Sequence, residues 1–309
     1  MSGPLYRSIN AYWKERYGER IQKVSLNAGF TCPNRDGTKA AGGCIYCNND
    51  SFNFSPDVSL REQLAQGIGH ARRRYGAAKF MAYFQAYSNT YGPPEHLYDV
   101  YSTILDFPEV IGLSVGTRPD CVPEEALCVL ERFKDTHEVW VEYGLESSRD
   151  DTLRRINRAH TFAEFRDAVM RTAGRGLRIA THIIAGFPWE DRATVLQTAR
   201  DVASLPIDAI KIHNLHVVRG TALEAMYRRS PFPLMSLEEY ASVVARILEL
   251  LPPEMLILRL SADCPPSLLA APDWCNRKTE IAAAVEAELR SRGTRQGSLH
   301  AQAVAILRE

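Results

Sequence analysis

An alternation of short apolar runs with stretches of helical spacing is the feature that most constrains the fold of this chain. Six runs read as strands of successive β–α units: residues 22–27, 79–87, 110–117, 138–146, 177–188 and 208–218. Such units predict a parallel sheet with right-handed crossovers. Because six units fall short of a closed eight-fold barrel, we expect an α/β fold of the partial, open (β/α)6 TIM-like type. A doubly wound open sheet is the alternative, and in either fold the site lies at the carboxyl ends of the strands.

The last quarter of the chain departs from this alternation. Residues 236–309 show two further helical patterns around Pro-rich loops, so we expect a C-terminal helical cap packed on a core of residues 1–235. The chain has 309 residues, of which 45% are hydrophobic and 24% charged, an ordinary globular composition. Because the N-terminus lacks the apolar core of a signal peptide and no apolar run is long enough to span a membrane, we expect a cytoplasmic protein.

Three of the seven cysteines lie close together, directly after the first predicted strand. Cys32, Cys44 and Cys47 form a Cys-x11-Cys-x2-Cys motif within residues 32–47. Clustered thiols in the cytoplasm bind metal more often than they form disulfides. One interpretation is a zinc loop, but tetrahedral zinc needs a fourth ligand from a distant Cys or His. The other is a [4Fe–4S] cluster in which three thiolates hold three irons and leave the fourth iron open.

The cysteine motif and five later motifs resemble those of the radical S-adenosylmethionine (SAM) superfamily. The later motifs are AYFQAYSNTY, VGTRPDCVP, VEYGLESSRDDTLRRINRAH, HIIAGFPWE and IKIHNLHVVRGT. More narrowly, residues 6–280 are similar to a small bacterial family of the YhcC type, which is related to the radical SAM domain of the elongator catalytic subunit. Tyr46 matches the aromatic residue usual before the last cysteine, whereas the usual first gap of about three residues is here eleven.

The resemblance implies that Cys32, Cys44 and Cys47 hold the cluster. It implies SAM contacts by seven further residues: Tyr46 and Gly186 near the adenine, Gln85, Ser88 and Asn89 at the methionine amine, Glu142 at the ribose, and Arg158 at the carboxylate. These residues also have structural interpretations. Glu142 fits a salt bridge, Arg158 fits a solvated helix start, and residues 85–89 fit a polar turn. We assign no role to five other candidates: His182, His213, His216, Cys264 and Cys275.

The resemblance also implies a reaction. A reducing donor of the flavodoxin or ferredoxin type supplies one electron, SAM is cleaved to methionine and a 5′-deoxyadenosyl radical, and the radical abstracts a substrate hydrogen. Kinship with elongator suggests a tRNA substrate, whose wobble-uridine side chain would change from carboxymethylaminomethyl to aminomethyl. Residues 149–178 carry eight Arg against four Asp and Glu, as a phosphate-binding patch requires, although Lys+Arg and Asp+Glu both total 37 in the chain. The alternatives are a radical SAM enzyme acting on a small metabolite and, least favoured, an iron–sulfur electron carrier or redox sensor.

Overall fold

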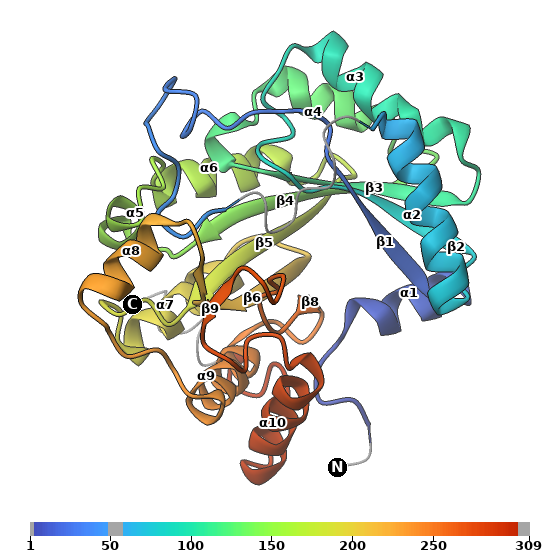
Figure 1. Cartoon of the computed structure of the whole chain (residues 1–309). Helices are drawn as coiled ribbons and strands as arrows, with labels where there is room; N and C mark the ends of the chain where they lie inside the picture. The colour runs from blue at the N-terminus through green and yellow to red at the C-terminus, as the bar shows by residue number, and fades with distance from the viewer. Residues whose placement is uncertain (1–2, 49–57, 302–309) are drawn as a thin grey trace.

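A seven-stranded parallel sheet organises the protein, whose computed structural model describes residues 3–48 and 58–301. The strands lie in the order β1-β2-β3-β4-β5-β6-β8, with β1 and β8 at the two edges. Their bounds are β1 (Ile21–Leu26), β2 (Lys79–Phe84), β3 (Val110–Thr117), β4 (Glu138–Glu146), β5 (Arg178–Ala185), β6 (Ala209–Asn214) and β8 (Leu256–Arg259). Because the order never reverses, the sheet curls as an open half-barrel, as predicted, and is not doubly wound (Figure 1).

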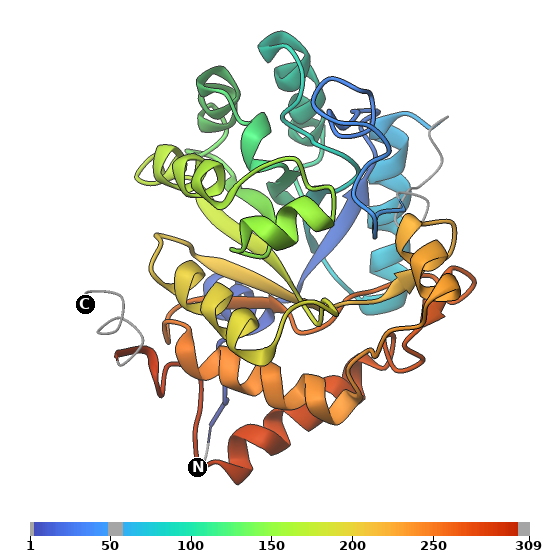
Figure 2. The same cartoon turned by 90° about the vertical axis from the view of Figure 1, so that its left-hand side faces the viewer.

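Helices connect the strands and cover the outer face of the sheet (Figures 1 and 2). Along the chain they are α2 (Leu60–Tyr75), α3 (Pro94–Ser102), η2 (Thr103–Asp106), η3 (Pro119–Cys121), α4 (Glu124–Glu131), α5 (Asp150–Arg155), α6 (Phe162–Thr172), α7 (Arg192–Ala203), α8 (Ala222–Arg229), α9 (Leu237–Leu250) and α10 (Lys278–Ser291). Three of them, α2, α6 and α9, begin with a capping box. In each box a Ser or Thr hydroxyl and a Glu three residues later accept hydrogen bonds from the free N–H groups of the helix start.

The parallel sheet has seven strands, one more than the six that the sequence predicts. β8 lies within residues 236–309 and pairs in parallel with β6. The same segment also provides α9 and α10, which pack together, and β9 (Leu269–Ala271), which pairs antiparallel with β7 (Val217–Val218). The segment therefore contains the expected helices and extends the sheet. A boundary at residue 235 stays a prediction, and residues 1–2 of the predicted core, an internal stretch at 49–57 and residues 302–309 of the predicted cap lie outside the described residues.

Three predicted strands end earlier than expected, which leaves polar residues beyond the sheet. The run 79–87 stops at Phe84, and Tyr87 then takes a left-handed backbone with φ of 68°. The run 177–188 stops at Ala185, where Gly186 turns the chain with φ of 107°. The run 208–218 divides into β6 and β7.

The short helix α1 (Ile9–Tyr17) closes the amino end of the half-barrel. Its Ile9 and Trp13 join an apolar cluster with inward residues of the strands, among them Met81 and Trp140. Trp140 is followed two residues later by Glu142, which faces the same side because side chains alternate along a strand. The barrel interior is therefore apolar at its amino end and turns polar towards the carboxyl ends. Within the described residues, no helix has the length and apolar character needed to cross a membrane.

Candidate active site

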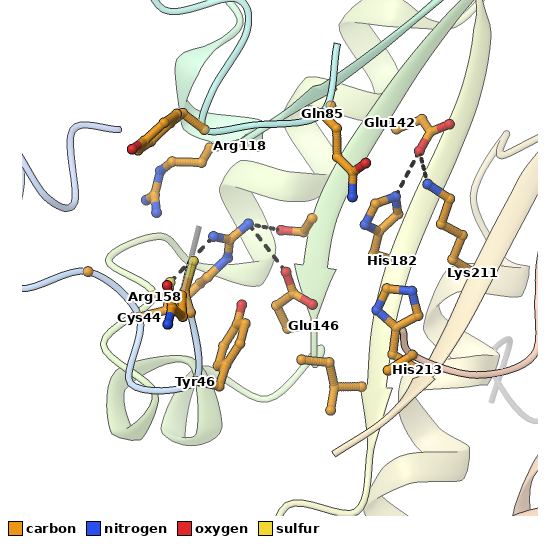
Figure 3. Close-up of a pocket in the computed structure, with 18 of the residues that line it drawn as sticks. Cys44, Tyr46, Gln85, Arg118, Glu142, Glu146, Arg158, His182, Lys211 and His213 are labelled. Carbon is orange, nitrogen blue, oxygen red and sulfur yellow. Dashed lines mark hydrogen bonds and ion pairs between the residues drawn. The ribbon is translucent and has the colours of Figure 1, made fainter. Parts of the chain in front are cut away.

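A cavity of about 240 Å³ opens at the carboxyl ends of the strands. Residues of the cysteine loop line one part of it, and residues of β2, β4, β5, β6 and β8 line the other. Figure 3 shows the two groups facing each other across the cavity. The cysteine end comprises Cys32, Cys44, Cys47, Tyr46, Arg118, Glu146 and Arg158. The lysine end comprises Tyr83, Glu142, His182, Lys211, His213 and Arg259.

The three predicted cluster cysteines converge at the cysteine end. Burial, together with the neighbouring Cys44 and Cys32, raises the pKa of Cys47 to about 12, so the three sulfurs act on one another. Several hydrogen bonds tie the loop to the segment after α5. The Ile45 amide donates to the Ile156 carbonyl at 3.0 Å, and Asn157 Nδ2 donates to the Gly43 carbonyl at 2.8 Å.

Arg158 holds the buried side of this loop. Its Nη1 donates to Cys44 Sγ at 3.5 Å, and its Nη2 donates to the Gly144 carbonyl at 2.6 Å. The same Nη2 lies 3.5 Å from Glu146 Oε1. A Cβ on Gly144 would lie 2.4 Å from Arg158 Nη2, so only glycine leaves room for the guanidinium. Both terminal nitrogens of the Arg158 guanidinium, Nη1 and Nη2, thus have protein partners. Its contact with the SAM carboxylate stays a prediction.

The cysteine end contains two residues that sequence reasoning missed. Glu146 ends β4 with a left-handed backbone, φ 75°, and burial raises the pKa of its carboxyl against the opposing charge of Arg158. The sequence could have indicated Glu146, because side chains alternate along a strand and Glu146, four residues after Glu142, falls on the same inward face. Arg118 donates from Nε and Nη2 to the two carboxylate oxygens of Asp120, at 3.0 Å each. Its Nη1 is buried and has no partner among the described residues, which suits it to an anionic group in the cavity.

At the lysine end, Glu142 is surrounded by donors from four other strands. Lys23 Nζ and Ser114 Oγ each lie 2.5 Å from Oε1, while Oε2 receives His182 Nε2 at 3.0 Å and an ion pair from Lys211. Burial would raise the pKa of Glu142, but the charges of Lys211 and Lys23 outweigh it and hold the pKa well below its ordinary value. Glu142 therefore forms buried ion pairs with Lys23 and Lys211, and its ribose contact stays a prediction.

Lys211 is a buried lysine that the sequence analysis did not single out. Its Nζ donates to the Tyr83 hydroxyl at 2.9 Å and lies 4.4 Å from the centre of that ring. Burial lowers the pKa of Lys211 to about 7 despite Glu142, with Lys23 and Arg259 adding to the decrease. Burial also lowers the pKa of His182 to about 4, so this histidine is neutral near pH 7. The sequence could have indicated Lys211, because Lys211 and His213 alternate with apolar residues along β6 and so share one face of the strand.

The other predicted residues divide between the cavity and the structure around it. Gln85 and Ser88 line the cavity, and the Ser88 hydroxyl is buried without a partner among the described residues. Asn89 instead joins two strands, since its Nδ2 donates to the carbonyls of Phe84 and Gly116. Asn89 and Gly186 are not among the residues that line this cavity. His182, His213 and His216 line it, whereas Cys264 and Cys275 are buried outside its lining.

The donor set at the cysteine end fits an iron–sulfur cluster better than a single ion. In the described part of the chain, no three Cys, His, Asp or Glu side chains gather closely enough to ligate one metal ion. A cluster makes a different demand, because each thiolate ligates its own iron. Asn34 Nδ2 and Arg158 Nη1, each 3.5 Å from Cys44 Sγ, are the kind of donors that tune cluster sulfurs.

A parallel half-barrel with three converging thiols at its open end defines a class of α/β enzymes that work with a metal cofactor. Comparison with known families narrows the class. The Radical SAM superfamily model matches residues 31–202, more than half of the chain, and the Radical_SAM C-terminal domain matches residues 207–291. The chain therefore belongs to the radical SAM superfamily, whose members use a [4Fe–4S] cluster and SAM.

Individual relatives agree with this assignment. The protein YtqA of Bacillus subtilis is 36% identical over 295 residues, which cover 94% of this chain and 92% of YtqA. The protein YhcC of Escherichia coli is 38% identical over 265 residues, 85% of each chain, and confirms the predicted relation to the YhcC type. The structure of the archaeal Elp3 of Methanocaldococcus infernus superposes with a TM-score of 0.65 at 17% identity, over 89% of this chain and 64% of that one. The similarity to this archaeal structure concerns the fold alone.

Proposed function

We propose that the enzyme cleaves SAM at a [4Fe–4S] cluster held by Cys32, Cys44 and Cys47 and uses the 5′-deoxyadenosyl radical to modify the side chain of a tRNA wobble uridine. The observation that supports SAM cleavage at a cluster is the convergence of the three thiols on one loop at the mouth of the half-barrel. A bound cluster supplies the electron that cleaves SAM and a site for its amino-acid group. An electron donor of the flavodoxin or ferredoxin type would reduce it.

The protein residues have positioning roles in this proposal. Arg158 holds Cys44 in place and neutralises part of the negative charge of the thiolates. Arg118, whose buried Nη1 has no partner within residues 3–48 and 58–301, is a second candidate besides Arg158 for the SAM carboxylate. Four further residues line the cavity and would contact the remaining polar groups of SAM: Glu146, Tyr46, Gln85 and Ser88.

The tRNA half of the proposal rests on the relation to YhcC and elongator and on a small basic surface. Arg149 and Arg155 are exposed on and before α5, whose following segment contacts the cysteine loop. Two residues of the Arg-rich stretch do not belong to this surface. Arg175 is paired with Glu124 and Glu131, and Arg178 begins β5 at the opposite end of the barrel. The expected patch of residues 149–178 therefore does not extend to its C-terminal end.

A wobble base suits a reaction inside a half-barrel because an anticodon loop is single-stranded. Unstacking one of its bases costs only a few kcal/mol, which lets the base enter a pocket. A tRNA substrate also makes the cytoplasm the expected compartment. The proposal of a small-metabolite substrate is the alternative, and the same experiment separates the two.

The test uses reconstituted, reduced enzyme with SAM and tRNA from a strain that lacks the gene. We expect a wobble-uridine nucleoside to change mass, and 5′-deoxyadenosine to exceed the amount formed without tRNA. If neither changes, the tRNA substrate is rejected. Deoxyadenosine formation in the absence of tRNA then still reports on the SAM-cleaving half of the proposal.

A further inference from the structure

The lysine end of the cavity holds more positive than negative charge. Lys23 and Lys211 both contact the single carboxylate of Glu142, and both ammonium groups also lie against the Tyr83 ring, 4.6 and 4.4 Å from its centre. Arg259 lines the cavity together with Lys211, and its nearest carboxylate, Asp263, lies 4.0 Å away and also lines the cavity. Crowded cations in a buried place are unfavourable, because each is desolvated and repels the others. An additional anion at this end would therefore be stabilised.

Hydrogen-bond donors remain for such an anion. When Lys211 is protonated, its ammonium has three N–H groups, and two are used by Glu142 and the Tyr83 hydroxyl, which leaves one for a further acceptor. His213 lies beside His182 with ring centres 5.6 Å apart, and its Nε2 is buried without a partner in the part of the chain that the structure describes. Both Lys211 and His213 line the cavity, opposite the cysteine end (Figure 3).

We propose that the lysine end binds a carboxylate carried by the reacting side chain of the substrate, with Lys211 as its main partner and Arg259 as the second. The inference rests on the proposed function and deepens it. A nucleotide that leaves its stack enters a pocket base first, so its phosphates stay at the rim and only a base substituent reaches the far end. The anion there is therefore a carboxylate of the uridine side chain rather than a backbone phosphate.

This arrangement also explains how substrate and product are told apart. A carboxymethylaminomethyl group brings a carboxylate to Lys211 and Arg259, where charge-assisted hydrogen bonds form in a desolvated place. An aminomethyl group ends in an ammonium, which the same cations repel. The lysine end thus retains the substrate and favours release of the product.

The experiment measures binding of three anticodon stem-loops that differ only in the wobble uridine, which carries carboxymethylaminomethyl, aminomethyl or no substituent. Reconstituted enzyme with SAM is kept unreduced so that no turnover occurs. We expect the wild type to bind the carboxylate-bearing loop about tenfold more tightly than the aminomethyl loop. Lys211→Met should reduce that preference to about twofold or less, and Lys211→Arg should restore most of it. Lys14→Met, which changes an exposed lysine on α1, should keep the wild-type preference.

Three results would overturn the inference. Equal binding of the carboxymethylaminomethyl and aminomethyl loops by the wild type rejects it and leaves the tRNA proposal intact. A full preference in Lys211→Met protein with normal iron content rejects it in the same way. If none of the loops binds, the tRNA substrate and this inference are both rejected. If the Lys211→Met protein loses its iron or its native circular dichroism spectrum, the Arg259→Gln variant is measured in its place. We expect its preference for the carboxymethylaminomethyl loop over the aminomethyl loop to fall by about threefold or more.

Discussion

Arg158 donates from Nη1 to the sulfur of Cys44 at 3.5 Å, although 114 residues separate them in the chain. The residues on either side, Asn157 and Ala159, have left-handed backbones with φ of 54° and 56°. Such backbones are strained in residues other than glycine, so the surrounding structure must hold this turn in place. The contact joins the cysteine loop to the end of β4 and makes the loop part of the barrel rather than a free surface segment.

Arg158→Met should therefore weaken both the cluster site and the fold. Removing one member of a buried ion pair leaves Glu146 without its counter-charge, at a cost of about 3 kcal/mol in unfolding free energy. We expect a lower urea midpoint and less iron after anaerobic reconstitution. Arg154→Met is the matched control, since its exposed pair with Asp151 should contribute about 0.5 kcal/mol or less. Unchanged stability and iron content in the Arg158 variant would contradict the positioning role.

The cluster assignment predicts about four iron and four sulfide per chain in anaerobically reconstituted protein. Alanine in place of Cys32, Cys44 or Cys47 should abolish the cluster, because each thiolate ligates a different iron. Cys128→Ala, at an exposed position on α4, should leave iron content unchanged. Iron, sulfide and visible absorption are the measurements. Wild-type protein that keeps zinc and takes up no iron would favour the zinc interpretation instead.

Glu142→Gln should destabilise the protein in a pH-dependent way. The pKa of Glu142 is held well below its ordinary value of 4.5 by Lys211 and Lys23, although burial opposes them. A carboxyl with a lowered pKa stabilises the fold fully above that ordinary value and loses its contribution as the pH falls towards the folded pKa. At pH 7 the variant should lose about 3 kcal/mol of unfolding free energy, since the buried Lys211 and the half-buried Lys23 lose their counter-charge.

The comparison that tests this prediction is urea unfolding of wild type and variant at pH 7 and below pH 4.5. The gap in free energy between the two proteins should narrow at the lower pH. A gap that stays constant would show that the charge of Glu142 does not stabilise the folded state.

Arg149 and Arg155 should govern the salt dependence of tRNA binding. If both neutralise phosphates at the rim, log K falls against log[salt] by roughly 0.7 to 0.9 for each. Replacing both by Ala should flatten the slope by about 1.4 to 1.8 and weaken modified and unmodified tRNA alike. Arg178→Ala, at the opposite end of the barrel, should leave the slope unchanged. A slope unaffected by the double substitution would place the tRNA elsewhere on the surface.

The half-barrel could be predicted from the sequence because each parallel strand forms its own run of apolar residues. Buried strands such as β4 read as apolar runs, and each is separated from the next by an amphipathic helix. β8 was missed because it has only four residues and follows Pro252 and Pro253, where the pattern is too short to distinguish a strand from a loop. Its place in the sheet depends on pairing with β6, which no local pattern reports.

The sequence by itself determined the three clustered thiols, the β–α alternation and the edge of the sheet where they meet, because spacing and periodicity are local properties. Only the tertiary structure decided which polar groups face one another. Lys23, Lys211 and Glu142 are far apart in the chain, and their separate strands bring them into one buried cluster. The same holds for Arg158 and Cys44. Partners of this kind are set by the curvature and register of the whole sheet, so they follow from the fold and not from any single segment.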